Sequence, residues 1–342
     1  MSVEELQLRI QELAAEIERQ KEVLNQLERS KKATQRQLNA LRDPIARLPL
    51  EISSEIFLQC LRSELPRPDP SAAPMLLLNI CNAWTNIALS TPALWAAISI
   101  ERPCHELLRI WPQRARSYPL SVGIEGELES EIAVIGGFSK KLKHLAIDFD
   151  ENPPLSSFTT LGPFPSLETL DIGSLAQREI YEVSITEMID LLRLASNLVE
   201  FTLHNVATRV DYNEKAVILP NIRTVKFGAA LLELASYDAF LRYISLPSLS
   251  TLFLPLRVIS VDDFVLFWKR SSAPLQKLDL GEGCYELTFL ELEPCFRLVP
   301  SLVHLELCFE LECLADLITV LGSSPSEFLP NLQSLKIEDI SI

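Results

Sequence analysis

The chain has 342 residues and a formal net charge of −15, and 48% of its residues are hydrophobic. This length predicts roughly two or three structural units, and the hydrophobic fraction is enough for a large core. A surface this acidic repels phosphate backbones, which argues against nucleic acid as a partner, and only ten glycines argue against a disordered low-complexity chain.

The cysteines and the amino terminus predict an intracellular protein, cytoplasmic or nuclear. Seven cysteines are present, an odd number with no Cys-x-x-Cys pair. The amino terminus MSVEELQLRI lacks the basic start and apolar core of a secretory signal. No apolar run approaches the ~18 residues that cross a bilayer, so we expect no membrane contact and reduced, mostly buried cysteines.

Residues 1–43 predict a coiled-coil helix, because nine of the twelve seam positions of a heptad repeat are apolar. The seam holds Val3, Leu6, Ile10, Leu13, Ile17, Gln20, Leu24, Leu27, Lys31, Thr34, Leu38 and Leu41. A helix with such a stripe packs on another helix, so a short or conditional dimer is expected. A solvated helix docked on its own chain fits the pattern nearly as well.

Residues 44–100 predict a small helical domain, since Pro44 ends the preceding helix. One apolar helical face comprises Ile45, Leu48, Ile52, Ile56 and Cys60. After a proline-rich loop, a second apolar face comprises Leu77, Ile80, Cys81, Trp84, Ile87 and Ala88.

Three motifs follow one another in this domain: Leu48-Pro49-x-Glu51-Ile52, Ile80-Cys81-x-x-Trp84 and Pro92-x-Leu94-Trp95. In this order they resemble an F-box. With its leading coiled coil and leucine-rich tail, the chain is similar to the divergent F-box proteins of mushroom-forming fungi. The loop from Arg62 to Pro74 departs from the pattern, because it is longer than the usual F-box connection.

An F-box docks a Skp-family adaptor, which links it to a cullin-type ubiquitin ligase. The resemblance therefore implies a non-catalytic substrate receptor whose adaptor-facing residues are Leu48, Pro49, Ile52, Ile56, Leu94 and Trp95. A helical unit this small cannot bury all of its apolar side chains, so some remain for a partner. Trp84 is expected in the domain's own core, whereas Leu94 and Trp95 fit the core and the interface equally well.

From residue 101 to 342 one phrase recurs, leucine-x-x-leucine-x-leucine, often after a lead-in such as FPSL, LPNI, VPSL or LPNL. Its eight copies begin at Leu142, Leu167, Leu198, Ile222, Leu249, Leu275, Leu302 and Leu332. The spacing of 24 to 31 residues lies within or just beyond the leucine-rich-repeat range of about 20–29.

The repeats predict an α/β fold in which short parallel strands and crossover helices stack as a solenoid. One such helix is expected after Ser184, which forms a capping-box pattern with Glu187. Leucine-rich repeats usually carry asparagine or cysteine three positions after the last leucine, and this chain does not. We therefore expect an irregular horseshoe.

Residues between the leucines alternate away from the core and line an open face of the strands. The candidate target-binding residues on this face are His144, Glu168, Arg223, Thr251, Lys277 and His304. They are varied and mostly polar, which suits a protein or peptide target better than a small molecule. The alternative is a solvated face that binds nothing.

The sequence carries no recognisable catalytic or cofactor motif: neither Gly-x-Ser-x-Gly nor a glycine-rich phosphate loop is present. His304 and Cys308 are four residues apart, a spacing that would suit a shared metal on a helix. They lie in a predicted strand, where an extended backbone sets residues at this spacing too far apart. We expect no metal, cofactor or catalysis. The substrate-receptor hypothesis has one alternative, a scaffold whose F-box-like motif no longer binds its adaptor.

Overall fold

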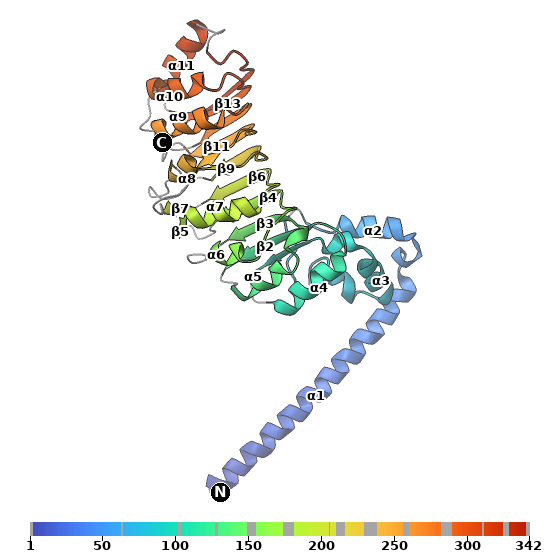
Figure 1. The fold of residues 1–342 in the computed structure, drawn as a ribbon. Coiled ribbons are helices and arrows are strands. Elements are labelled where there is room, and N and C mark those ends of the chain that lie inside the picture. Colours follow the sequence, from blue (N-terminus) through green and yellow to red (C-terminus); the bar gives the residue numbers. More distant parts are fainter. Residues whose placement is uncertain are drawn as a thin grey trace. The chain divides into compact units, whose positions relative to one another are not determined.

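A computed structural model of the chain (Figure 1) divides it into two compact units, unit 1 (Met1–Trp95) and unit 2 (Ala96–Ile342). The structure describes residues 3–62, 64–101, 104–126, 129–148, 155–173, 181–204, 206–209, 216–228, 238–255, 260–281, 289–309, 311–323 and 328–339. An α/β chain with a long N-terminal helix and a large parallel sheet is confirmed.

Unit 1 begins with α1 (Val3–Arg42), a continuous helix of 40 residues. The stretch contains no proline or glycine, and ion pairs one turn apart, such as Arg9–Glu12 at 3.0 Å, support its exposed surface. The helix ends before Pro44, as predicted, and a short 3₁₀ turn η1 (Ile45–Arg47) follows.

The rest of unit 1 is a small helical domain, with α2 (Leu50–Leu58), η2 (Leu76–Asn79), α3 (Asn82–Ser90) and η3 (Pro92–Trp95). Two helices lie in the predicted regions, but each is shorter than its predicted face: Ile45, Leu48 and Cys60 lie outside α2, and Leu77, Ile80 and Cys81 lie outside α3. Pro49 directly precedes α2, where its missing N–H costs no helical hydrogen bond. The buried core comprises Phe57, Leu77, Cys81, Ala88, Leu94 and Trp95.

Asp43 ties the end of α1 to the start of α3. Its carboxylate accepts hydrogen bonds from the backbone N–H of Ile45 at 2.9 Å, the thiol of Cys81 at 3.6 Å and the indole N–H of Trp84. The Trp84 ring also packs on Phe57, with the ring centroids 4.9 Å apart. Trp84 therefore serves the domain's own packing, as expected from the sequence.

Unit 2 is built on a ten-stranded parallel sheet whose strand order follows the chain. The strands are β1 (Ala97–Ile100), β2 (Leu120–Glu125), β3 (Leu142–Asp148), β4 (Thr169–Gly173), β6 (Glu200–His204), β9 (Thr224–Phe227), β11 (Thr251–Pro255), β12 (Lys277–Gly281), β13 (His304–Phe309) and β14 (Ser334–Asp339). The eight copies of the leucine phrase fall on eight successive strands, from β3 to β14.

Two small parallel pairs lie outside the main sheet: β5 (Tyr181–Ser184) with β7 (Val206–Arg209), and β8 (Val217–Ile218) with β10 (Ile244–Ser245). The predicted domain boundary at residue 100 needs correction. Residues 97–100 form β1, which pairs with β2, so the sheet begins directly after the helical domain.

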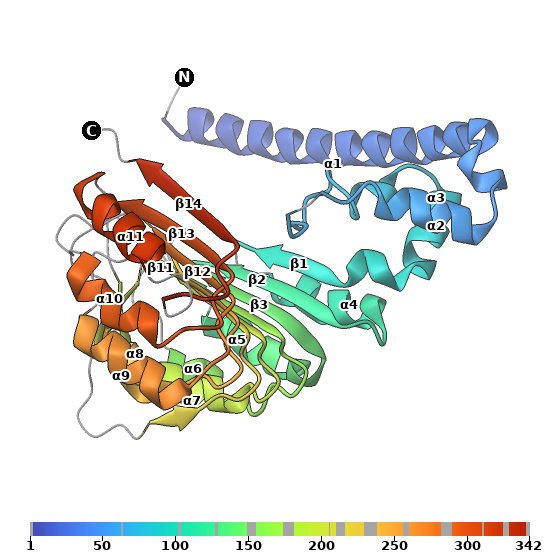
Figure 2. The same ribbon diagram turned by 90° about the horizontal axis from the view of Figure 1, so that it is seen from above.

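Helices connect the strands and pack against their neighbours along the chain. They are α4 (His105–Ala115), α5 (Glu129–Gly136), α6 (Leu155–Thr159), α7 (Ile185–Leu194), α8 (Asp238–Tyr243), α9 (Val261–Ser271), α10 (Phe289–Arg297) and α11 (Leu311–Ser323), with a 3₁₀ turn η4 (Ser139–Lys141). Figure 2 shows α7 to α11 along one side of the sheet. At the predicted start of α7, the Ser184 hydroxyl accepts from the N–H of Glu187 at 3.3 Å.

The strands alternate as predicted, so that one face is buried and the other is open. The register aligns one apolar row across eight strands: Leu145, Leu170, Phe201, Val225, Leu252, Leu278, Leu305 and Leu335. All are buried except Leu335, which is half-buried on the edge strand β14. Their burial beneath the helices provides the hydrophobic stabilisation of unit 2.

A ladder of side-chain hydrogen bonds between successive repeats lies just before the leucine phrases, where the sequence did not predict it. Asn197, Asn221 and Asn331 donate side-chain hydrogen bonds of 2.6, 2.8 and 2.9 Å to carbonyls of the preceding copy. Ser166 and Ser301 do the same, each at 2.8 Å. These bonds satisfy loop carbonyls and replace the ladder that is missing after the phrase.

Candidate partner-binding sites

Unit 1 turns an apolar surface of α2 and its lead-in outward. We call it the α2 patch: Leu48, Pro49, Leu50, Ile52 and Ile56. The exposed fractions of Leu48, Ile52 and Ile56 are 41, 52 and 37%. Four of these residues were predicted as adaptor-facing. Leu50, 47% exposed, was missed because it falls outside the helical i, i+4 series.

Small polar residues hold the opposite side of α2 in the domain. The Ser53 hydroxyl contacts the carbonyls of Ile45 and Pro49 at 3.3 and 3.2 Å, and the Ser54 hydroxyl contacts that of Thr91 at 2.8 Å. The helix therefore presents serines and Phe57 inward and its aliphatic side chains outward. Exposed aliphatic side chains gathered on one short helix are typical of a surface that a partner covers.

Leu94 and Trp95 do not belong to this surface. Both side chains are fully buried, and the Trp95 indole donates a 2.9 Å hydrogen bond to the Ala88 carbonyl. A side chain with no exposed area cannot contact an adaptor in this structure. The prediction that these two residues face the adaptor is therefore corrected in favour of the core alternative.

The loop that departs from the F-box pattern lines a cavity of about 590 Å³ in unit 1. Arg62, Pro66 and Arg67 line one part, and Leu76 and Ile80 another. None of the α2 patch residues lines this cavity. The cavity and the α2 patch are therefore separate surfaces of unit 1.

The six predicted target-binding residues spread along one edge of the open face. Thr251, Lys277 and His304 lie side by side on β11, β12 and β13, whereas His144 stands on β3. Glu168 and Arg223 directly precede β4 and β9, and Glu168 pairs with Lys143 at 3.2 Å. Burial, together with the charge of Lys143, lowers the pKa of His144 from its usual value, so this imidazole is neutral near pH 7.

A half-buried aromatic residue stands on the open face beside that edge. The Nζ atoms of Lys226 and Lys277, on the two neighbouring strands, lie 5.9 and 4.8 Å from the ring centroid of Phe253. Lys226 is also paired with Glu200, and Lys277 lies 3.9 Å from Glu306. We call Lys226, Phe253 and Lys277 the open-face cluster. An aromatic ring between two cations is a suitable anchor for a protein partner.

His204 forms an ion cluster with two aspartates on this face. Its Nε2 lies 3.2 Å from Oδ1 of Asp148, and its Nδ1 lies 3.1 Å from Oδ1 of Asp171. Hydrogen bonds to Asp148 and then Asp171 raise the pKa of His204 to about 9, so the imidazole is a cation near pH 7. Gly173 makes room for the ring, because a Cβ there would lie 2.0 Å from Nε2.

This ion cluster predicts a pH-dependent stability that the substitution His204→Gln removes. The pKa is higher in the folded state than the ~6.5 of an unfolded histidine, so the stabilisation is complete below pH 6.5 and is lost as the pH rises through 9. Because His204 is partly exposed, we expect a loss of only about 1–2 kcal/mol.

Chemical denaturation of the wild type and of His204→Gln at pH 6.5 and at pH 9.5 measures this loss. The exposed residue His304 provides the control variant His304→Gln, which should follow the wild type. If the wild type and His204→Gln lose stability in parallel between the two pH values, the assigned charge on His204 is wrong.

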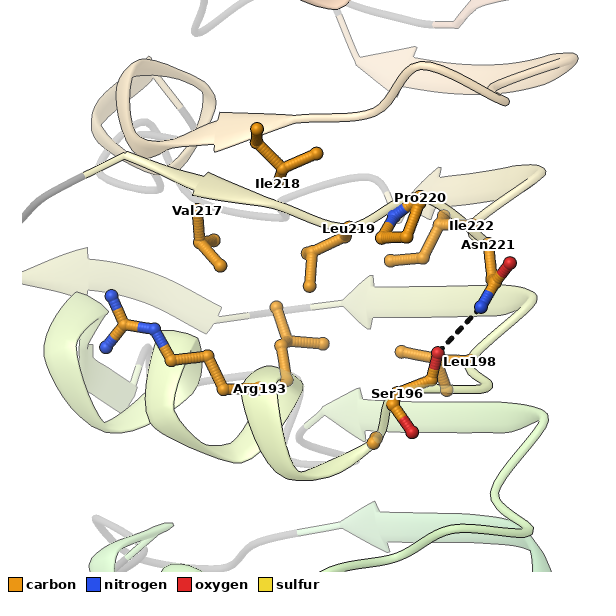
Figure 3. A pocket seen from close by; sticks show the side chains of 11 residues that line it. Arg193, Ser196, Leu198, Val217, Ile218, Leu219, Pro220, Asn221 and Ile222 are labelled. Atoms are coloured by element: carbon orange, nitrogen blue, oxygen red, sulfur yellow. Dashed lines mark hydrogen bonds between the residues drawn. The ribbon is translucent and has the colours of Figure 1, made fainter.

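A small pocket of about 200 Å³ lies between successive connections of unit 2 (Figure 3). Leu192, Leu198 and Ile222 form part of its wall, and the side chain of Asn221 bridges to the carbonyl of Ser196 at 2.8 Å. Apolar side chains dominate its lining, with Arg193 its one ionisable group. It is a gap between repeats without the convergent polar groups of a ligand site.

The described part of the chain has neither a metal-ligand cluster nor a membrane-spanning helix. Among the residues that the structure describes, no group of three or more histidine, cysteine, aspartate or glutamate side chains could hold a metal ion. Within the same residues, no helix has the length and apolar character needed to cross a membrane.

Comparison with known proteins adds little. No protein-family model matches the chain, and no curated protein matches it. Among solved structures, it is similar to "Crystal structure of Rad7 and Elc1 complex in yeast", with 12% sequence identity and a TM-score of 0.30, over 91% of this chain and 93% of that chain. A TM-score this low does not establish a shared fold.

Proposed function

We propose that this protein is a non-catalytic substrate receptor of a cullin-type ubiquitin ligase. The α2 patch binds a Skp-family adaptor, and the open face of unit 2 binds a protein target. The observation that carries the proposal is the outward orientation of Leu48, Ile52 and Ile56 within an F-box-like succession of motifs. The proposal implies an intracellular protein.

The chemistry of the α2 patch supports an adaptor. Four aliphatic side chains and one proline are exposed together on a single turn and helix, while the helix's polar serines face inward. Burying a fully exposed aliphatic side chain of this size contributes about 1.5–3 kcal/mol, so a side chain that is about half exposed can contribute roughly half of that to an interface. A patch of this kind gains the most binding free energy from a partner with an apolar groove.

The order of strands in unit 2 supports a leucine-rich-repeat-like horseshoe as the target-binding domain. Each copy of the phrase adds one parallel strand and one connection, and the helices line one side. This leaves the opposite side of the sheet open, and its half-buried Phe253 lies between two lysines. Varied polar residues around one aromatic anchor suit a protein or peptide target.

The mechanism requires no acid, base or nucleophile from this chain. With the adaptor and the cullin on unit 1 and a target on unit 2, the receptor raises the concentration of the target near the transferring subunits. Ubiquitin transfer is then catalysed by those subunits. The alternative function is an interaction scaffold whose F-box-like domain has lost its adaptor.

Assembly with the ligase tests the proposal. The full chain is co-expressed with a cullin, once with a Skp-family adaptor and once without it. We expect the cullin to co-purify with the chain only when the adaptor is present. If neither the adaptor nor the cullin is recovered with the chain, the scaffold alternative replaces the proposed function.

The open-face cluster gives a prediction for target binding. Removing the ring by Phe253→Ala should reduce recovery of cross-linked partners at least about tenfold, because a central aromatic anchor contributes 2 kcal/mol or more. Quantitative mass spectrometry of partners cross-linked to each variant provides the measurement. The control is Thr202→Ala, since Thr202 stands in the same lateral row of the open face. Equal recovery of partners with both variants would show that Phe253 is not part of the binding surface.

A further inference from the structure

The apolar seam of α1 is exposed along its length. Ile10, Ile17 and Leu24 have exposed fractions of 66, 55 and 56%. Among the described contacts of α1 with the helical domain, the Arg36 guanidinium lies 3.4 Å from Asn79 and Asn39 donates to the Ile80 carbonyl at 3.0 Å. In the heptad abcdefg, Arg36 and Asn39 occupy f and b, away from the a and d seam. Docking on its own chain therefore leaves the seam uncovered.

A shallow groove of about 330 Å³ lies on this seam. Its lining residues are Leu13, Glu16, Ile17, Gln20, Lys21 and Leu24. In heptad order these are positions d, g, a, d, e and a. In knobs-into-holes packing, four residues of one helix surround each side chain that enters from the other helix. In a parallel pair, a side chain at position a enters a hole formed by d, g, a and d. A side chain at position d enters a hole formed by a, d, e and a. The groove therefore comprises two successive holes of a parallel coiled coil.

We propose that a second copy of this chain occupies the groove, in a parallel, in-register, two-stranded coiled coil formed by α1. In this pairing Ile17 of one copy enters the first hole of the other copy, and Gln20 meets its own counterpart. Two facing amides can hydrogen-bond to each other, and a polar residue at a core position fixes register and strand number.

Charge complementarity favours the same arrangement. In a parallel pair a g residue faces the e residue five positions later on the other helix, so Glu16 faces Lys21 of the second copy, twice by symmetry. An antiparallel pairing of the segment from Val3 to Leu27 instead sets Gln20 against Ile10, which buries an amide group on an apolar side chain. Self-pairing in parallel thus covers the apolar seam and gives Glu16, Gln20 and Lys21 polar partners.

The paired segment should end near Leu27. From Val3 to Leu27, Gln20 is the single polar residue of the seam, whereas Lys31 and Thr34 occupy the next two positions. Separation beyond Leu27 leaves the docked end of each helix with its own domain. A dimer carries two α2 patches and two open faces, which raises the avidity for targets that have repeated binding sites.

The mass of the full purified chain, measured by light scattering after size-exclusion chromatography, tests the dimer. We expect twice the monomer mass of 38.5 kDa. Replacing two seam residues by Ile17→Asp and Leu24→Asp should halve the mass. The matched control, Leu8→Asp with Ala15→Asp at two f positions, should leave it unchanged.

Orientation is tested by Leu6→Cys. In the parallel register the two introduced thiols meet and should form an intermolecular disulfide under mild oxidation, beyond the level that the native cysteines give in the wild type. In an antiparallel helix pair they lie almost the helix length apart. A monomeric wild type, or a mass that the seam variants do not change, overturns the dimer, and a dimer without the Leu6→Cys cross-link overturns the parallel arrangement.

Discussion

Replacing Leu48 and Ile52 by aspartate is expected to weaken binding of a Skp-family adaptor by at least about 100-fold, which corresponds to about 2.7 kcal/mol. Both side chains are about half exposed, so each can transfer apolar area into an interface. The introduced carboxylates must in addition lose water without a partner. Because about half of each side chain is buried in the domain, the free energy of unfolding should fall by about 1–3 kcal/mol, and adaptor affinity is therefore compared per folded molecule.

The matched control places the same substitutions outside unit 1. Leu266 and Ile318, which are 56 and 54% exposed on α9 and α11, provide the variant Leu266→Asp with Ile318→Asp. It adds the same charges to the chain, so its adaptor affinity should equal that of the wild type. Equal loss in both double variants would mean that overall charge, and not the α2 patch, governs the interaction.

Trp95→Ala is expected to lower the free energy of unfolding by about 3–5 kcal/mol, the range for truncating a large buried aromatic residue. The side chain is 0% exposed, and its indole N–H donates to the Ala88 carbonyl. The substitution therefore leaves both a cavity and a carbonyl without its donor. Chemical denaturation of the full chain, followed by the fluorescence change of the remaining tryptophans, measures the loss.

Trp95→Phe separates the two roles that the sequence left open. It keeps most of the buried ring and removes the hydrogen bond, so it should recover more than half of the stability lost in Trp95→Ala. If Trp95 belongs only to the core, the adaptor affinity per folded molecule should be the same in both variants. Loss of adaptor binding by a fully stable Trp95→Ala variant would restore Trp95 to the interface.

The strands of unit 2 were predictable because their signal is local. The phrase sets alternate side chains on opposite faces, and Leu252 with Leu254 then identifies the buried face of a strand without knowledge of its neighbours. The ladder before the phrases was missed for a different reason. The lead-ins LPNI and LPNL contain Asn221 and Asn331, but the carbonyl partners of these side chains lie one repeat earlier, 25 and 31 residues away.

Helical periodicity identified the apolar stripe of α2 but not the direction in which it points. A period of 3.6 residues defines a face, and only tertiary packing decides whether that face is covered. Here Ser53 and Ser54 allow the other face to approach the domain closely, which leaves Ile52 and Ile56 outside. Leu94 could be placed only when the packing around it was known.

The open-face features depend on register between distant segments. His204 meets Asp148 across 56 residues of sequence and passes over Gly173 on the intervening strand β4. Phe253 was hidden because it stands between two leucines and reads as part of an apolar run. Strand alternation predicts that it points outward, but its two lysine neighbours appear only in the sheet.

Titration of the purified full chain with a purified Skp-family adaptor, followed by isothermal calorimetry, tests the central claim most directly. The account predicts saturable binding of one adaptor per chain, with a dissociation constant below about 10 μM, and its loss in the Leu48→Asp, Ile52→Asp variant. An intact wild-type chain that gives no binding signal at adaptor concentrations far above this value would contradict it.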